Sequence, residues 1–409
     1  MAPHPPPLRV RERSVLLALV AGLFGGALSS LLLVSLDLAT HLQTKNPSLL
    51  YFLPVAGLFI GGLYQQFGGR SVKGTNLVVE EIHRPTERTP GRMVPLVYAT
   101  SILSHLFGAS VGREGVAVQM SAGLADQLSR FFRISKEERT TLLQAGSAAG
   151  FAGALGTPFA GFVFGLEVLR PELPFKFERA LECAIAAFVA IGVTHFFGIH
   201  HTRYGVLPSG LPLFSLHLGF AALVLGAATG LMVRIFIATT EALSLLSKSL
   251  FHSFGARAFC GGCLIIGTTF LVGNHDSIGL GIPKIQSSFI AASSASLPFE
   301  KLLFTALSIG FGFKGGEFIP LVFIGATLGS SLALLLQVPI AFAAACGVTS
   351  AFGSAARVPF ALSLFAGEHF YPGFIIYALA ANFAARWVVG STATIFPSQH
   401  LLRITSFAP

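Results

Sequence analysis

Residues 14–36 form one run of apolar and small side chains that contains no charge. A helix needs about 20 such residues to cross the hydrocarbon core of a bilayer, so this run is long enough to span it. Charged residues make up 11% of the whole chain, whereas about a quarter of the residues of a soluble protein are charged. The sequence therefore predicts an integral membrane protein that crosses the lipid bilayer several times.

Later apolar runs are shorter, and several contain glycine or proline. Broken helices are stable at membrane depth only where their free backbone groups are buried in protein or line a cavity. This pattern is typical of transporters and channels. We expect an all-α fold of many tilted, re-entrant and broken helices.

The segment before the first run, residues 1–13, carries Arg9, Arg11 and Arg13. Basic residues accumulate on the cytoplasmic side of membrane proteins, so this flank is expected in the cytoplasm. The chain as a whole is expected to be a multi-pass protein of the cell inner membrane. The other basic residues lie mainly in loops, where they are expected at the membrane surface. Without a soluble basic domain, no nucleic-acid partner is expected.

A short pattern occurs twice in the chain, first as Gly112-Arg113-Glu114-Gly115 and then, 203 residues later, as Gly315-Gly316-Glu317-Phe318. A shift of 201 residues also aligns eight identical residues further along, including Glu167 with Glu368. We therefore predict two inverted repeats, 14–204 and 205–395, as in many transporters. A short tail, 396–409, follows, and no soluble regulatory domain is expected.

Three predicted helix starts combine glycine with small or capping side chains: Gly74-Thr75-Asn76 and the two copies of the repeated pattern. The start of a helix has free backbone N–H groups and a partial positive charge, which together bind anions. Such groups hold an anion by several moderate contacts and can release it. The sequence therefore predicts anion sites at these helix starts.

Glu114 is the residue expected to control this site. A carboxylate at a helix start competes with an anion for the same N–H groups, and protonation removes its charge and frees them. One side chain can thus couple proton uptake to anion passage; a simple helix cap is the alternative. Arg113 is expected to be a cation at the pore mouth that attracts anions, or else an arginine that extends to the membrane surface.

The run from Gly112 to Met120 resembles the gating-glutamate motif of the CLC family of anion channels and anion/proton antiporters. Further similarity lies at 74–76, 156–161, 166–171 and 315–320. The resemblance implies a homodimer with two independent pores, in which each subunit is an antiparallel duplicate. It also implies a halide anion and protons as substrates, and Glu114 as the external gate. The residues expected to contact the anion are Thr75, Asn76, Gly112, Arg113, Gly115, Glu317, Phe318, Ile319 and Phe396.

Within this family, the chain is most similar to the bacterial branch that exports fluoride. Glu317 is characteristic of that branch, and Val168 stands where the chloride exchangers carry an internal glutamate. Two positions depart from the branch: Ile319 replaces a threonine, and Phe396 replaces a tyrosine that could donate an O–H hydrogen bond. Fluoride/proton antiport is therefore expected, with chloride as the other candidate anion and a passive chloride channel as the other candidate activity.

Two acids and a histidine lie outside this site. Glu167 and Glu368 are expected to be structural acids at helix ends, with proton relay as the alternative. His105 is expected to be a hydrogen-bonded interior histidine, although its ordinary pKa would also suit proton transfer.

An intramembrane enzyme is the remaining and less favoured class of function, and no enzymatic activity is expected. The chain contains no His-Glu-x-x-His and no Gly-x-Ser-x-Gly pattern. Neither a cofactor nor a metal ion is expected.

Overall fold

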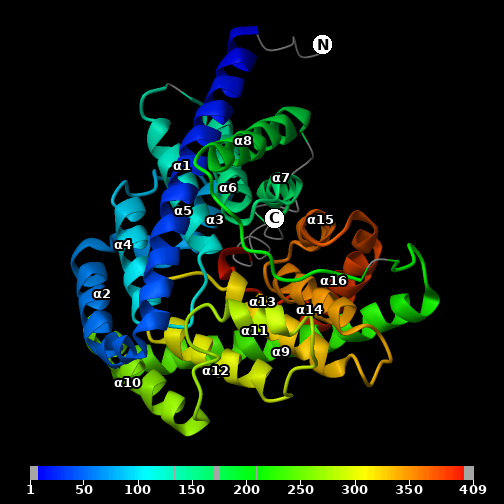
Figure 1. The fold of residues 1–409 in the computed structure, drawn as a ribbon. Coiled ribbons are helices and arrows are strands. Elements are labelled where there is room, and N and C mark those ends of the chain that lie inside the picture. The colour runs from blue at the N-terminus through cyan, green and yellow to red at the C-terminus, as the bar shows by residue number, and fades with distance from the viewer. Residues whose placement is uncertain (1–7, 133, 169–175, 209, 400–409) are drawn as a thin grey trace, which may run out of the picture.

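The computed structural model describes residues 8–132, 134–168, 176–208 and 210–399. These residues form sixteen α-helices and four 3-10 helices, without a β-strand among them. This result confirms the expected all-α fold (Figure 1). The first eight α-helices are α1 (Leu8–Lys45), α2 (Leu53–Phe67), α3 (Thr75–His83), α4 (Met93–Leu106), α5 (Glu114–Leu128), α6 (Lys136–Leu155), α7 (Pro158–Glu167) and α8 (Phe177–Phe196).

The remaining helices complete the second half of the chain. The other α-helices are α9 (Leu216–Leu250), α10 (Phe254–Val272), α11 (Ile282–Ser287), α12 (Leu297–Gly310), α13 (Phe318–Leu332), α14 (Ile340–Ala355), α15 (Pro359–His369) and α16 (Ile375–Val389). The 3-10 helices are η1 (Pro47–Phe52), η2 (Gly69–Lys73), η3 (Pro372–Phe374) and η4 (Pro397–Gln399).

Helices α1 to α8 and helices α9 to α16 follow a similar order of lengths. Each series begins with a long helix, of 38 residues in α1 and 35 in α9. The third helix is short in both, with 9 residues in α3 and 6 in α11. The fourth and fifth helices have 14 and 15 residues in each series. Two copies of one structural unit would produce this order.

The two series pack against each other in Figure 1, where α1 to α8 run from blue to green and α9 to α16 from green to red. Contacts between them include α2 with α10, α7 with α15, and α5 with α13.

Within the described part of the chain, six helices, including α1 and α9, are long and apolar enough to cross a membrane. The first of them carries large apolar side chains on its exposed face, among them Leu16, Leu23 and Val34. Apolar side chains are stable in this position when lipid surrounds them. The shorter apolar helix α13 is buried along most of its length. The helices thus fit an integral membrane protein with partial spans in its interior.

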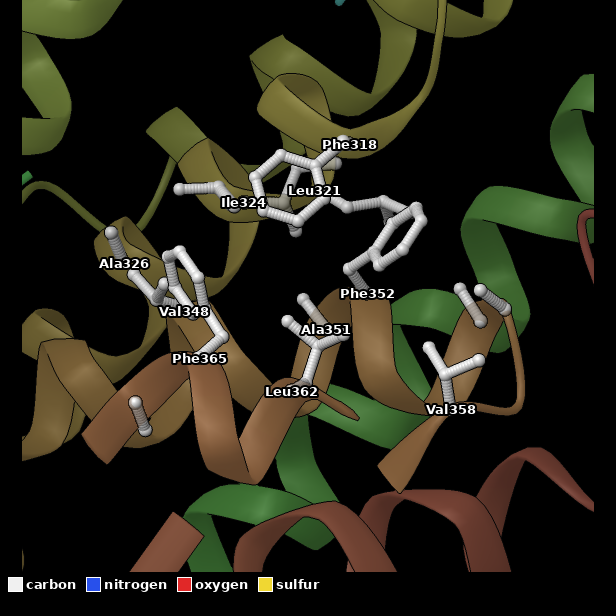
Figure 2. Packing of buried hydrophobic residues seen from close by; sticks show 14 of the residues in the cluster. Phe318, Leu321, Ile324, Ala326, Val348, Ala351, Phe352, Val358, Leu362 and Phe365 are labelled. Atoms are coloured by element: carbon white, nitrogen blue, oxygen red, sulfur yellow. The ribbon is translucent and has the colours of Figure 1, made fainter. Parts of the chain in front are cut away.

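The largest apolar core includes the packed faces of α13, α14 and α15 (Figure 2). The ring of Phe318, at the start of α13, lies edge-on to Phe352 with the ring centroids 4.8 Å apart. It also lies edge-on to Phe365, at 5.9 Å. Edge-to-face packing is a favourable arrangement for aromatic rings. These contacts fix the start of α13 against the core.

Glu167 and Glu368 make reciprocal contacts between α7 and α15. The Glu167 carboxylate accepts hydrogen bonds from two backbone N–H groups in the first turn of α15, at 3.1 and 2.8 Å. The Glu368 carboxylate accepts two from the first turn of α7, at 3.0 and 2.8 Å. Each acid thus satisfies N–H groups that a helix start leaves without partners. The structural role expected for this pair agrees with these contacts.

Replacing Glu167 or Glu368 with glutamine is expected to lower the free energy of unfolding by about 1–2 kcal/mol. A neutral amide accepts hydrogen bonds less strongly than a carboxylate, and it has only one oxygen for two N–H groups. Thermal unfolding in detergent measures the effect. Glu137→Gln is the control, because this exposed acid pairs with Lys176 at the surface and should contribute little. A large effect at one position and none at the other would contradict the reciprocal arrangement.

The folded part of the chain extends beyond the expected repeat boundaries at both ends. Helix α1 begins at Leu8, inside the expected flank 1–13. Phe396 and η4, in the expected tail, pack into the protein. Residues 1–7 and 400–409, and Pro171 of the aligned repeat, lie outside the described residues.

Candidate functional site

The two copies of the repeated glycine pattern lie side by side. The Gly112 N–H donates to the Gly316 carbonyl at 2.6 Å, and the Gly316 N–H donates to the Gly112 carbonyl at 2.7 Å. This pair of hydrogen bonds is an antiparallel bridge. Each glycine lies two residues before a helix, α5 in the first case and α13 in the second. The bridge therefore joins two helix starts from opposite halves of the chain.

A third helix start meets the other two. A β-carbon placed on Gly115 would lie 3.3 Å from Gly316 Cα and 3.7 Å from Thr75 Oγ1. Helices α3, α5 and α13 therefore begin within a few ångströms of one another, and only small residues allow this approach. The three helix starts expected from the sequence are all present, and the fold brings their free N–H groups into one region.

Glu114 is the first residue of α5 and is buried, with 1% of its surface exposed. Its Oε2 accepts a hydrogen bond from the Arg113 backbone N–H at 3.2 Å. Its Oε1 is buried with no hydrogen-bond partner among the described residues. The carboxylate thus turns back onto the start of its own helix, away from lipid and bulk water. It occupies an N–H group of the kind that would bind an anion.

Arg113 differs from its expected role. Its Nη1 donates to Asp37 Oδ1 on α1 at 3.1 Å, and its Nη2 donates to Thr202 Oγ1 at 2.7 Å. The residue is only 3% exposed. This arrangement does not favour the expected role of a pore-mouth cation, because Asp37 balances the charge and the surrounding protein buries the guanidinium. What Arg113 offers the site is its backbone N–H and a guanidinium Nε 3.6 Å from Glu114 Oε1.

A cavity of about 300 Å³, which we call the inner cavity, adjoins this meeting point. Expected anion-binding residues from both halves of the chain line it. Its lining includes Thr75, Asn76, Gln119, Lys314, Glu317 and Phe396. Glu317 is the one acid among the lining residues that the structure describes.

Two neutral side chains can donate hydrogen bonds into the inner cavity. Thr75 Oγ1 accepts a hydrogen bond from Gln119 Nε2 at 3.0 Å, so its own hydrogen is available to another acceptor. Asn76 Oδ1 accepts from the Ser398 backbone N–H at 3.4 Å, which leaves the NH₂ end of the amide for donation. Neutral donors of this kind suit a small anion, which accepts hydrogen bonds only.

The other expected residues have more limited roles. Phe396 contributes an apolar wall to the inner cavity. A β-carbon on Gly112 would lie 3.1 Å from the backbone N of Ile319, so it is the backbone of Ile319 that reaches the bridge. The ring of Phe318 belongs to the apolar core of Figure 2, which leaves only its backbone to face an anion.

A buried ionic network shows in which direction α3 runs from the inner cavity. Arg139, at the start of α6, contacts Glu81 on α3 at 3.1 Å and Asp126 on α5 at 2.6 Å. The neighbouring Glu138 pairs with Arg13, near the start of α1. Helix α3 therefore runs from the inner cavity toward the end of the molecule where α1 begins.

Several residues of the site were not predicted. Gln119 orients the Thr75 hydroxyl, and Lys314 lines the inner cavity. Gln119 and Lys314 are polar side chains in apolar stretches, which is a signal of function in a membrane protein. His105 is buried with Nδ1 2.8 Å from the Ser101 carbonyl, the interior hydrogen bond expected for it.

Comparison with known proteins agrees with this architecture. The family model described as "Voltage gated chloride channel" matches residues 56–390. The chain belongs to this family. It is therefore an integral membrane protein of a family of channels and transporters.

Two relatives show where the chain stands within the voltage-gated chloride channel family. A chloride/fluoride channel protein of Pseudomonas syringae pv. tomato is 41% identical over 391 residues, which cover 94% of this chain and 86% of the relative. An H(+)/Cl(-) exchange transporter of Vibrio cholerae, ClcA, is 29% identical over 66% of this chain and 60% of the relative.

Solved structures have the same fold. A CLC-type fluoride/proton antiporter superposes with a TM-score of 0.90 at 32% identity, over 95% of this chain and 98% of that one. A slow cyanobacterial Cl⁻/H⁺ antiporter superposes with a TM-score of 0.80 at 19% identity, over 99% of both chains, and shares the fold.

Proposed function

We propose that this protein exchanges fluoride for protons across the membrane and that Glu114 is the coupling residue. The observation that carries the proposal is the position of the Glu114 carboxylate. It is buried where three helix starts meet, and it accepts a hydrogen bond from a backbone N–H at one of them. A carboxylate and a small anion cannot occupy the same N–H groups together, because their like charges repel.

Protonation would open the site in the following way. A proton from the outer solution neutralises Glu114, so that the carboxyl group leaves the N–H groups and an anion from the inner cavity takes its place. The anion is then released outward, and Glu114 loses its proton toward the inner side and returns. Thr75 and Asn76 serve as neutral donors on the inner side of this path, and Gln119 keeps the Thr75 hydroxyl oriented.

Fluoride is favoured over chloride by the similarity to the Pseudomonas syringae relative and to the solved fluoride/proton antiporter. Glu317 lines the inner cavity, at a position where a glutamate is characteristic of the fluoride-exporting branch. Val168 offers no carboxylate, and both oxygens of the adjacent Glu167 are bound to α15. Proton release through Glu167 is therefore not part of the proposal.

We further propose that two copies of the chain form a homodimer and that each copy consists of two inverted repeats. The protein would lie in a bacterial inner membrane, with the start of α1 on the cytoplasmic side. The repeats are 14–204 and 205–395, and the similar order of helix lengths supports them. Exposed aromatic pairs on α7 with α8 and on α15 with α16 would suit a dimer contact: Phe159 packs on Phe188 at 5.1 Å and Phe360 on Phe383 at 5.5 Å.

Flux measurements on purified protein in liposomes test the proposed function. Vesicles are loaded with fluoride or chloride, and external anion and pH are recorded together. We expect fluoride efflux to drive proton uptake and to exceed chloride efflux by about tenfold, which corresponds to about 1.4 kcal/mol of selectivity. Chloride efflux with no change in pH would identify a passive channel and would contradict the proposal.

A further inference from the structure

The inner cavity has an excess of basic side chains. Lys73, Lys248, Arg257 and Lys314 line it, against the single acid Glu317. Lys73 is paired with Glu80 at 2.7 Å, and Lys248 is exposed. The Arg257 guanidinium lies 4.7 Å from the centre of the Phe254 ring. The cavity therefore keeps a positive potential, which attracts anions.

Lys314 lies two residues before Gly316, one of the two glycines of the bridge between the helix starts. It directly precedes Gly315 and Gly316, and its backbone N–H donates to Ser104 Oγ at 3.2 Å, which anchors this turn to α4. Its Nζ lies 4.1 Å from the centre of the Tyr64 ring. No ion pair involves Lys314 among the described residues.

The Tyr64 contact stabilises a partly buried cation without neutralising it. The face of an aromatic ring attracts an ammonium group through its quadrupole and carries no net charge. A carboxylate partner would have cancelled the field of the ammonium in the cavity, as Asp37 does for Arg113. Lys314 thus contributes a positive charge to the same cavity that the neutral donors Thr75 and Asn76 line.

We propose that Lys314 is an anion-binding residue that captures fluoride from the inner solution and that Tyr64 holds its ammonium group in place. This proposal rests on the proposed function, because it assigns the inner step of the same transport. The anion is first held by the ammonium group and then passes to Thr75, Asn76 and the helix starts. The charge at Lys314 therefore controls how readily the site fills at low fluoride.

Fluoride efflux from liposomes, measured as initial rate against internal fluoride at low and high ionic strength, tests this role. Lys314→Met keeps the length of the side chain and removes the charge. We expect its KM at low ionic strength to rise about tenfold, with kcat nearly unchanged and with the dependence on ionic strength largely lost. Lys314→Arg should keep a KM within about twofold of the original protein.

Two further variants separate recruitment from folding. Tyr64→Leu removes the ring and leaves the charge of Lys314. Its KM should therefore stay much closer to that of the original protein than the KM of Lys314→Met does. If the contact were only structural, Tyr64→Leu and Lys314→Met would show the same loss of kcat. Lys284→Met is the matched charge control, because Lys284 pairs with Asp276 at 2.8 Å and lines a different cavity.

An unchanged KM in Lys314→Met would overturn this inference, as would a fall in kcat alone. The pH trace of the original protein is read in the same vesicles. If the original protein moved fluoride without protons, the proposed antiport would be contradicted. The effect of Lys314→Met on the KM for fluoride could still be measured, so the two proposals can fail separately.

Discussion

Glu114→Gln is expected to abolish proton movement while the fold remains intact. Glutamine has nearly the same shape as glutamate, but it carries no charge and cannot gain or lose the proton that couples the two fluxes. Fluoride-driven proton uptake in liposomes should fall by about 100-fold or more, the loss typical when a proton-transferring group is removed. A fluoride electrode and a pH electrode in the same vessel measure both fluxes.

Glu137→Gln is the matched control for this substitution. Glu137 lies at the start of α6 and has an exposed side chain paired with Lys176, so the same chemical change there should leave both fluxes unaltered. Proton uptake that continues at the original rate in Glu114→Gln would show that another residue carries the proton. Normal unfolding behaviour of the variant in detergent separates loss of coupling from loss of structure.

Gly316→Ala is expected to stop anion transport by forcing apart the helix starts. A β-carbon at Gly316 would lie 2.9 Å from the Gly115 backbone N and 3.3 Å from its Cα. Because these neighbours are backbone atoms, the bridge to Gly112 must shift or break. We expect a loss of about 1–3 kcal/mol in the free energy of unfolding and a larger effect on transport, because the N–H groups no longer converge.

Gly267→Ala provides the comparison, since a β-carbon at that position on α10 meets no atom within 4 Å. This variant should transport normally and unfold at the same temperature or slightly higher, because alanine favours a helix more than glycine does. Normal fluoride efflux in Gly316→Ala would contradict the importance of the close approach at the site.

The sequence predicts the helix starts of the site well because their signals are local. Whether a glycine precedes a helix and whether a carboxylate lies in its first turn can be read from a few neighbouring residues. The repeat adds longer-range information. It pairs Glu167 with Glu368, and the structure shows each of them bound to the first turn of the equivalent helix in the other half of the chain.

The roles of individual side chains were harder to predict because they depend on partners distant in sequence. The pairing of Arg113 with Asp37 and Thr202 joins segments 76 and 89 residues away. The ring of Phe318 turns into the core because Phe352 and Phe365 fill that side of α13. Neither contact leaves a pattern in the local sequence, so both residues received a more direct role at the anion site than the structure supports.

The competition between Glu114 and fluoride is tested most directly by binding at equilibrium. Fluoride is titrated calorimetrically into purified protein at several values of pH between 5 and 7.5, for the original chain and for Glu114→Gln. If one proton must bind for each fluoride, affinity in the original chain should rise as pH falls, by up to about tenfold per pH unit, and should not change with pH in Glu114→Gln. Equal affinity of the original chain for fluoride at all these pH values would contradict the account.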